Sequence, residues 1–329
     1  MPAGYHHLIR DQRSQIYALK SNGLEQQDIA HHLGVHPSTV SRELSRNQGG
    51  RGYRFQQADT LATERRRIAS SRPKRMTKDV IKIIEEKIQE KWSPEQISGR
   101  LKLETDICIS HESIYQHIWA DKQQGGILYT HLRQSGKKYN KRSSDKAGRG
   151  CIPNRVDISK RPNIVEEKSR LGDWEGDTII GAKHQGAILS LVDRKSKFTL
   201  LGKLRNKTAD SVVKATTACF NKLDDPIVHT ITYDNGKEFS NHEKISELLG
   251  ASCYFATPYH SWERGLNEHT NGLVRQYVPK STDLLKVSPR ALQIIENALN
   301  DRPRKILSFL TPKEVRNCMA KPTRMILRC

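Results

Sequence analysis

Apolar side chains recur at helical spacing in the first part of the chain and are interrupted twice by glycine. The first stripe ends at residues 21–23, Ser-Asn-Gly, and a second, shorter stripe ends at Gly34. Pro37 and Ser38 then open a third helical stretch, because proline suits the first turn of a helix. The pattern predicts a helix-turn-helix. Its expected buried positions are Leu8, Ile9, Ile16, Leu19, Ile29, Ala30, Leu33, Val35, Val40 and Leu44.

The third of these helices carries the expected nucleic-acid contacts. In a helix-turn-helix the last helix lies in the major groove, with its first turns against the base edges. Three short helices around a glycine turn also occur in proteins that bind no DNA, and that alternative is open at this point. If the unit binds DNA, its contacts are expected from Ser38, Thr39, Ser41, Arg42 and Arg46.

A second helical module is predicted over residues 78–135. Ser93 to Gln96 supplies an N-cap, a first-turn proline and a capping-box glutamine, and Ser110 can cap a further helix. The outer face of that last helix has no arginine, so direct DNA contact and a packing or dimerisation role are equally compatible with it. Two stretches rich in Lys and Arg, residues 61–77 and 136–164, are predicted to be linkers that follow DNA phosphates.

The pattern changes to strands after residue 170. Segments GDWEGDTIIG, GAILSLV and KFTLLGKL predict three antiparallel strands. Helical and strand patterns then alternate through VHTITYD and SCYFAT to a long helix over about 263–277. This order predicts an α/β domain with a mixed sheet over residues 165–315, preceded by the all-α modules; the unit at residues 1–60 is the first of these, and residues 316–329 form an atypical tail.

Charge narrows the expected partner. The 329 residues include 56 Lys or Arg and 36 Asp or Glu, giving a net charge of +20 at pH 7. Such an excess favours a polyanion, with nucleic acid first and an anionic membrane surface second. A mean hydropathy of −0.71 and the lack of an apolar run of about 18 residues argue against the membrane.

The cysteines and the N-terminus indicate the compartment. The six cysteines are scattered and form no C-x-x-C pair, so neither a zinc site nor a disulfide framework is predicted. The first residues lack the apolar core of a secretory signal. We therefore expect a cytoplasmic protein.

Three carboxylates are positioned where a mixed sheet gathers side chains. Asp177 lies in the first strand, Asp234 ends the fourth, and Glu268 lies on the long helix. Carboxylate oxygens suit Mg²⁺ or Mn²⁺, and two such ions can clamp the attacking and leaving oxygens of a phosphoryl transfer. Asp173, Glu175 and Asp177 share one face of the strand, so spacing alone leaves the choice among them open.

The long helix adds a second group of polar residues to this site. One of its faces carries Arg264, Glu268, Asn271 and Arg275, and the opposite face is mainly apolar. If the apolar face packs on the sheet, Glu268 projects toward the active edge. Arg264, Asn271 and Arg275 are then expected to contact DNA next to it.

These residues resemble the DDE transposases and retroviral-type integrases, and most closely the bacterial insertion sequence 30 family of transposases. The likeness rests on WEGDT at 174–178, YDNGKEF at 233–239 and PYHSWERGLNE at 258–268. It extends to STVSREL at 38–44 and NDRPR at 300–304. The 33 residues between Asp234 and Glu268 match the family's spacing, and the resemblance thereby selects Asp177, Asp234 and Glu268 as the catalytic and metal-binding acids.

The resemblance implies a ribonuclease-H-like core and two Mg²⁺ ions, with Mn²⁺ as a possible substitute. It implies binding to the element's terminal inverted repeats, strand cleavage by water, and joining of the freed 3′-hydroxyl to target DNA. A homo-oligomer is expected, because two ends must be brought together. A non-catalytic DNA-binding protein, such as a repressor, is the alternative from another class.

Overall fold

The computed structural model describes most of the chain in two compact units, Met1–Lys74 and Arg75–Cys329. Within them the described residues are 7–71, without the side chains of 69–71, and then 76–105, 107–133, 152–182, 185–258, 260 and 265–320.

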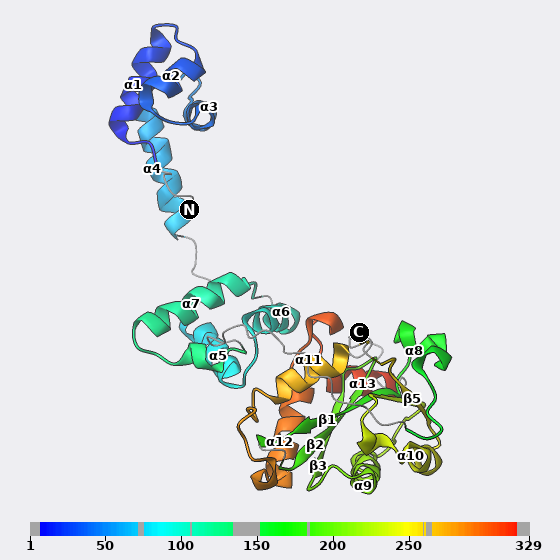
Figure 1. The fold of residues 1–329 in the computed structure, drawn as a ribbon. Coiled ribbons are helices and arrows are strands. Elements are labelled where there is room, and N and C mark those ends of the chain that lie inside the picture. The colour runs from blue at the N-terminus through cyan, green and yellow to red at the C-terminus, as the bar shows by residue number, and fades with distance from the viewer. Residues whose placement is uncertain are drawn as a thin grey trace. The chain divides into compact units, whose positions relative to one another are not determined.

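The first unit is built from four helices, coloured blue to cyan in Figure 1. They are α1 (Arg10–Ser21), α2 (Gln26–Leu33), α3 (Pro37–Asn47) and α4 (Phe55–Ser71). Gly34 ends α2 with φ +61°, in the left-handed region that favours glycine. The predicted helix-turn-helix is confirmed, and Val40 and Leu44 are buried as expected. Ile9 is an exception at 60% exposed, because it precedes α1 in extended backbone, where helical spacing does not apply.

A buried ion pair that the sequence pattern did not indicate ties this unit together. Arg13 Nε on α1 donates to Glu43 Oε1 on α3 at 2.8 Å, and Arg13 Nη1 donates to Asp59 Oδ1 on α4 at 3.0 Å. Tyr53 donates its hydroxyl to the same Glu43 oxygen at 3.3 Å. The three helices therefore share one charge network, and the orientation of α3 depends on it.

The predicted linker at 61–77 is helical as far as Ser71, so a linker beginning at 61 is wrong. Ala58 and Ala62 are buried on one side of α4, which gives the helix a packed face. On its outer side Arg67 pairs with Glu64 at 2.7 Å, one helical turn away. Charged residues favour a helix as readily as a linker, and only packing distinguishes the two.

The second helical module consists of α5 (Lys78–Gln89), α6 (Pro94–Glu104), α7 (His111–Gln123) and the short η1 (Leu128–His131). Both predicted caps are confirmed. Ser93 Oγ accepts from the Gln96 N–H at 3.3 Å, and Gln96 Oε1 accepts from the Ser93 N–H at 3.0 Å. Ser110 Oγ accepts from the Ser113 N–H at 3.1 Å. The helices enclose a core that includes Ile84, Ile97 and Ile114.

The predicted mixed sheet is confirmed, with strand order β3-β2-β1-β4-β5. The first three strands are antiparallel, whereas β1 pairs with β4 and β4 with β5 in parallel. The strands are β1 (Asp173–Ile180), β2 (Ala187–Asp193), β3 (Thr199–Leu204), β4 (Thr230–Tyr233) and β5 (Ser252–Phe255).

Helices cover both faces of this sheet (Figure 1). Trp174 and Tyr233 face α9 (Ala209–Phe220) and α10 (His242–Leu249). Ile179 and Ile188 face α11 (Gly265–Val274) and α12 (Pro289–Asn300). The other segments are α8 (Asn163–Glu167), α13 (Pro312–Ala320), η2 (Ile158–Lys160), η4 (Lys237–Phe239), η6 (Leu284–Lys286) and η7 (Lys305–Leu307).

Two further predicted boundaries are wrong. Part of the predicted linker at 136–164 is packed, because Phe255 of β5 donates its N–H to the Val156 carbonyl at 2.9 Å. The predicted tail from 316 continues α13 to Ala320, and Arg316 is buried against the Phe198 ring at 5.2 Å. Charge suggested a linker for the first segment and an atypical sequence suggested a tail for the second, yet each finds partners on the sheet domain. Residues 134–151 and 321–329 of these predictions lie outside the described residues.

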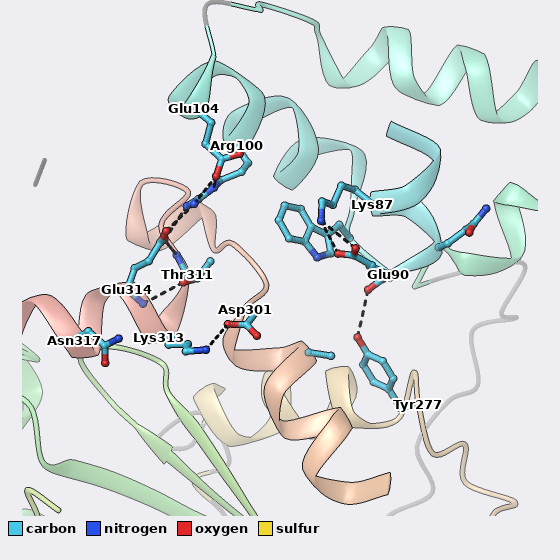
Figure 2. Close-up of a pocket in the computed structure, with 13 residues that line it drawn as sticks. Lys87, Glu90, Arg100, Glu104, Tyr277, Asp301, Thr311, Lys313, Glu314 and Asn317 are labelled. Carbon is cyan, nitrogen blue, oxygen red and sulfur yellow. Dashed lines mark hydrogen bonds and ion pairs between the residues drawn. The ribbon is translucent and has the colours of Figure 1, made fainter. Parts of the chain in front are cut away.

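The second helical module is joined to the C-terminal helix by a two-pronged ion pair (Figure 2). Arg100 of α6 donates to both carboxylate oxygens of Glu314 on α13, at 2.7 and 2.6 Å. Lys305 pairs with Glu95 of α6 at 2.6 Å, although both are largely exposed. These contacts support the packing role for the module.

We expect Glu314→Gln to lower the melting temperature by about 2–4 °C at pH 7, because a partly exposed ion pair contributes about 1 kcal/mol. Arg100 holds the pKa of Glu314 below its ordinary value of 4.5, so this stabilisation is present above that pH. It is lost as the pH falls through the lowered pKa. Thermal unfolding from pH 7 to pH 3, with the exposed-site variant Glu247→Gln as control, measures this, and an equal difference at all pH values would contradict it.

Candidate active site and nucleic-acid interface

The three acids on one face of β1 differ in their surroundings. Asp173 is buried and accepts from Arg170 Nε at 2.9 Å and Thr230 Oγ1 at 2.8 Å. Glu175 is 2% exposed and pairs with Arg194 Nη1 at 2.6 Å, and burial raises its pKa. Asp177 alone of the three is partly exposed. The two inner acids are thus engaged in the core, and Asp177 is the one that a ligand can reach.

The sheet brings Asp177 and Asp234 to the same level. In the parallel pairing of β1 with β4, Glu175 lies opposite Thr232. Asp177 lies two residues after Glu175, and Asp234 lies two residues after Thr232. Asp234 directly follows the last residue of β4. The carboxyl ends of adjacent parallel strands meet at one edge, where ligands bind in open α/β sheets. The Gly236 N–H donates to Asp234 Oδ1 at 2.8 Å and orients that carboxylate.

Gly176 has no side chain, and this leaves room for the Tyr233 ring beside β1. A Cβ at this position would lie 2.4 Å from Tyr233 Cε1, closer than atoms can approach. The Tyr233 ring is fully buried and stacks on Phe239 with centroids 4.3 Å apart. The aromatic pair therefore fills the space beneath the strand ends that carry the two aspartates.

Asn271 of α11 connects the helix to the first aspartate. Its Nδ2 donates to Asp177 Oδ2 at 2.8 Å, and its Oδ1 accepts from Ser190 Oγ at 2.9 Å. The Thr178 N–H donates to the other Asp177 oxygen at 2.8 Å. Asn271, expected at the DNA, thus has its amide engaged by protein side chains.

Glu268 lies on α11 one turn before Asn271 and is exposed. In the described part of the chain, no three His, Cys, Asp or Glu side chains are grouped closely enough to hold a metal ion. The structure therefore brings the two aspartates to one edge without gathering the three acids into a closed ligand set.

Of the two arginines expected to contact DNA beside Glu268, one is described. Arg275 Nη2 donates to the Ile180 carbonyl at 2.6 Å, at the end of β1, and burial lowers its pKa. Arg264 lies outside the described residues. Arg275 is thus bonded to the end of the strand that carries Asp177.

Two further polar residues next to the aspartates were not singled out from the sequence. Glu238 is buried, accepts from Thr178 Oγ1 at 2.9 Å and pairs with Lys207 Nζ at 2.5 Å. Asn235 accepts from Arg155 Nη1 at 2.5 Å and donates to the Ala256 carbonyl at 2.8 Å. Both belong to the YDNGKEF segment, which was the available signal for them. They brace the loop that follows β4.

Comparison with known proteins now identifies the family. Residues 4–47 match the helix-turn-helix domain model, and residues 168–261 match the integrase core domain model. The chain is 46% identical to the transposase for insertion sequence element IS4351 of Bacteroides fragilis, over 94% of each chain. It is 37% identical to transposase InsI for IS30A of Escherichia coli, over 94% of this chain and 83% of that one. The chain belongs to the insertion sequence 30 family of transposases.

Two further similarities were found. The chain is 38% identical to the transposase for IS1086 of Cupriavidus metallidurans, over 97% of each chain. The catalytic core of BIV integrase aligns with 46% of this chain and 98% of its own length, at 19% identity and a TM-score of 0.37. The integrase core match contains Asp177 and Asp234 and ends before Glu268.

Several expectations follow from family membership. The transposase is an enzyme of the DDE class with a ribonuclease-H-like core, as predicted, and it binds DNA. An integrase core of this kind depends on divalent metal ions. Among its described helices none is long and apolar enough to cross a bilayer. The alternative considered from the sequence, a non-catalytic DNA-binding protein, does not fit a family of transposases.

The transposase presents the predicted side of α3 outward. Ser41, Arg42 and Arg46 are exposed, and Thr39 is partly exposed. Ser38 Oγ lies 2.9 Å from His36 Nδ1, next to the start of the helix. Contact of these residues with DNA remains a prediction, and their exposure leaves them free to make it.

Proposed function

We propose that the transposase cuts and joins DNA at a site formed by Asp177, Asp234 and Glu268, with two Mg²⁺ ions, or Mn²⁺ in their place. The observation that carries the proposal is the parallel β1–β4 register, whose last pair, Glu175 and Thr232, lies two residues before Asp177 and Asp234. Asp177 is also the only acid of its strand face that the core does not bury.

The side chains at this edge suit hard divalent cations. The three residues are carboxylates, the ligands that Mg²⁺ prefers, and one carboxylate oxygen of each aspartate already accepts a backbone N–H. When bound, two such ions supply the positive charge that stabilises the attacking and leaving oxygens of an in-line phosphoryl transfer. Asp177 and Asp234 would hold them from the sheet, and Glu268 from α11.

Within the protein, Asn271 is a positioning residue. By donating to Asp177 Oδ2 while accepting from Ser190, it fixes the plane of that carboxylate from the helix that also carries Glu268. Hydrogen-bonded partners of this kind orient metal-binding carboxylates and raise metal affinity. This role takes the place of the predicted DNA contact for Asn271.

The reaction has two transfers at one site. In the first, a water oxygen bonds to the phosphorus at an element end, the bond to the 3′ oxygen breaks, and that oxygen leaves as a hydroxyl. In the second, the 3′-hydroxyl attacks a phosphodiester of target DNA, displaces its 3′ oxygen and joins the strands. The residues of the site act mainly by positioning and by charge.

The DNA that enters this site is selected elsewhere. We propose that α3 binds the terminal inverted repeats through Ser38, Thr39, Ser41, Arg42 and Arg46. Because both element ends must meet, the active form is a homo-oligomer. Such a protein works in the cytoplasm, on the DNA of the nucleoid.

Substitution of the acids tests the proposal. Asp177→Asn, Asp234→Asn and Glu268→Gln should each reduce Mg²⁺-dependent nicking of an end-containing duplex by at least about 10³-fold, because each removes a charged metal ligand. DNA affinity without metal should stay unchanged. Glu247→Gln, on α10 and exposed, is the matched control. Full nicking by any of the three variants would remove that residue from the site.

Asn271→Ala should raise the Mg²⁺ concentration for half-maximal nicking by about 10-fold or more, since loss of an orienting partner typically weakens metal binding by that amount. Duplex affinity measured in EDTA should match that of the unsubstituted protein. A loss of affinity in EDTA, with an unchanged Mg²⁺ requirement, would instead make Asn271 a DNA contact.

Arg42→Ala should weaken binding to the element end by about 1–3 kcal/mol and reduce discrimination against unrelated DNA, as expected for a base contact. Fluorescence anisotropy on both duplexes measures this, with Lys20→Ala on the exposed side of α1 as the control. Equal weakening on both duplexes would restrict Arg42 to phosphate contact.

A further inference from the structure

A cavity of about 970 Å³ lies beside α11, bordered also by η7 and the start of α6. Its α11 lining includes His269, Thr270 and Leu273, whereas Asn271 of the same helix contacts Asp177. Seven Lys or Arg side chains border the cavity, against three Glu. It is therefore a cationic cavity separate from the carboxylate edge.

Each of the three glutamates that border the cavity already pairs with a lysine or an arginine. Glu95 pairs with Lys305 at 2.6 Å. Glu175 pairs with Arg194 at 2.6 Å, and Glu166 pairs with the same guanidinium at 3.0 Å. These acids are thus committed to Lys305 and Arg194, and the other arginines at the cavity have no carboxylate partner among the residues that the structure describes.

Arg304 is the least satisfied of these arginines. It is 7% exposed, and its Nη2 donates to the Leu299 carbonyl at 3.0 Å. Its Nε and Nη1 are buried and have no hydrogen-bond partner among the described residues. Burial and the neighbouring Arg302 lower its pKa to about 9, so it is still charged at neutral pH. A buried, unpaired charge is unfavourable, so an anion that reached these donors would be bound favourably.

The residues next to Arg304 add positive charge and do not neutralise its guanidinium group. Arg302 is 2% exposed and donates to two neutral amides, Gln96 Oε1 and Gln276 Oε1, both at 2.8 Å. Arg133 Nη1 lies 3.5 Å from His269 Nδ1. Three guanidinium groups therefore line one cavity without a carboxylate partner among the described residues.

We propose that this cavity binds a phosphate group, held chiefly by Arg304 with Arg302 and Arg133. Guanidinium donors match phosphate oxygens in geometry and charge, and the Nε–H and Nη1–H of Arg304, which point in different directions, have no acceptor among the described residues. The phosphate comes either from a DNA strand or from free phosphate in solution. The site does not depend on the proposed metal-binding acids, and it is tested without catalysis.

Thermal unfolding in inorganic phosphate tests the site on the full chain. At a phosphate concentration about ten times its dissociation constant, the melting temperature should rise by about 4 °C relative to chloride of equal ionic strength. Arg304→Met should lose this rise, and its melting temperature in chloride should be no lower than that of the unsubstituted protein. Lys214→Met, an exposed charge on α9, should keep the rise.

Duplex binding identifies the source of the phosphate. If it belongs to DNA, Arg304→Met should reduce the slope of log affinity against log salt by about 0.9, the value for one phosphate contact. Stabilisation by inorganic phosphate with an unchanged slope would assign the site to free phosphate. If Arg304→Met keeps the phosphate-dependent rise and the slope, the site is overturned, whether or not the acid variants lose nicking. A melting temperature of Arg304→Met well below that of the unsubstituted protein in chloride would also overturn it, because Arg304 would then be structural.

Discussion

The parallel pairing of β1 with β4 is the constraint on which the candidate site depends. It places two segments more than fifty residues apart in the chain side by side, with β4 ending at Tyr233 beside the middle of β1. Gly176 makes this pairing compatible with the Tyr233 ring, since a side chain there would occupy its space. From one face of the sheet, Asn271 of α11 then donates to Asp177.

Burial separates the charged residues of the sheet domain by role. Asp173 and Glu175 lie deep in the core and pair with Arg170 and Arg194, so both carboxylates are engaged within the fold. Asp177 lies two residues further along the same strand face and keeps access to solvent. Arg304, by contrast, is buried without a carboxylate partner among the described residues. Burial and pairing, more than residue type, therefore distinguish the charged residues of this domain.

Predicted boundaries were wrong in charged segments for one physical reason. Runs of Lys and Arg satisfy the pattern of a solvated linker, yet a helix needs only a narrow packed face to persist. Ala58 and Ala62 supply that face in α4, and Arg316 supplies it in α13 by lying on Phe198. Such contacts join distant parts of the chain, so local composition does not contain them.

The sequence by itself determined the elements, their order, the family and the three candidate acids, because periodicity, capping residues and motif spacing are local properties. It left Asp173, Glu175 and Asp177 equivalent until a resemblance chose among them. Tertiary structure gave that choice a physical basis, since burial and pairing depend on neighbours far along the chain. It likewise decided that Asn271 holds a carboxylate and that Arg304 has none among the described residues, because hydrogen-bond partners are fixed only when distant segments pack.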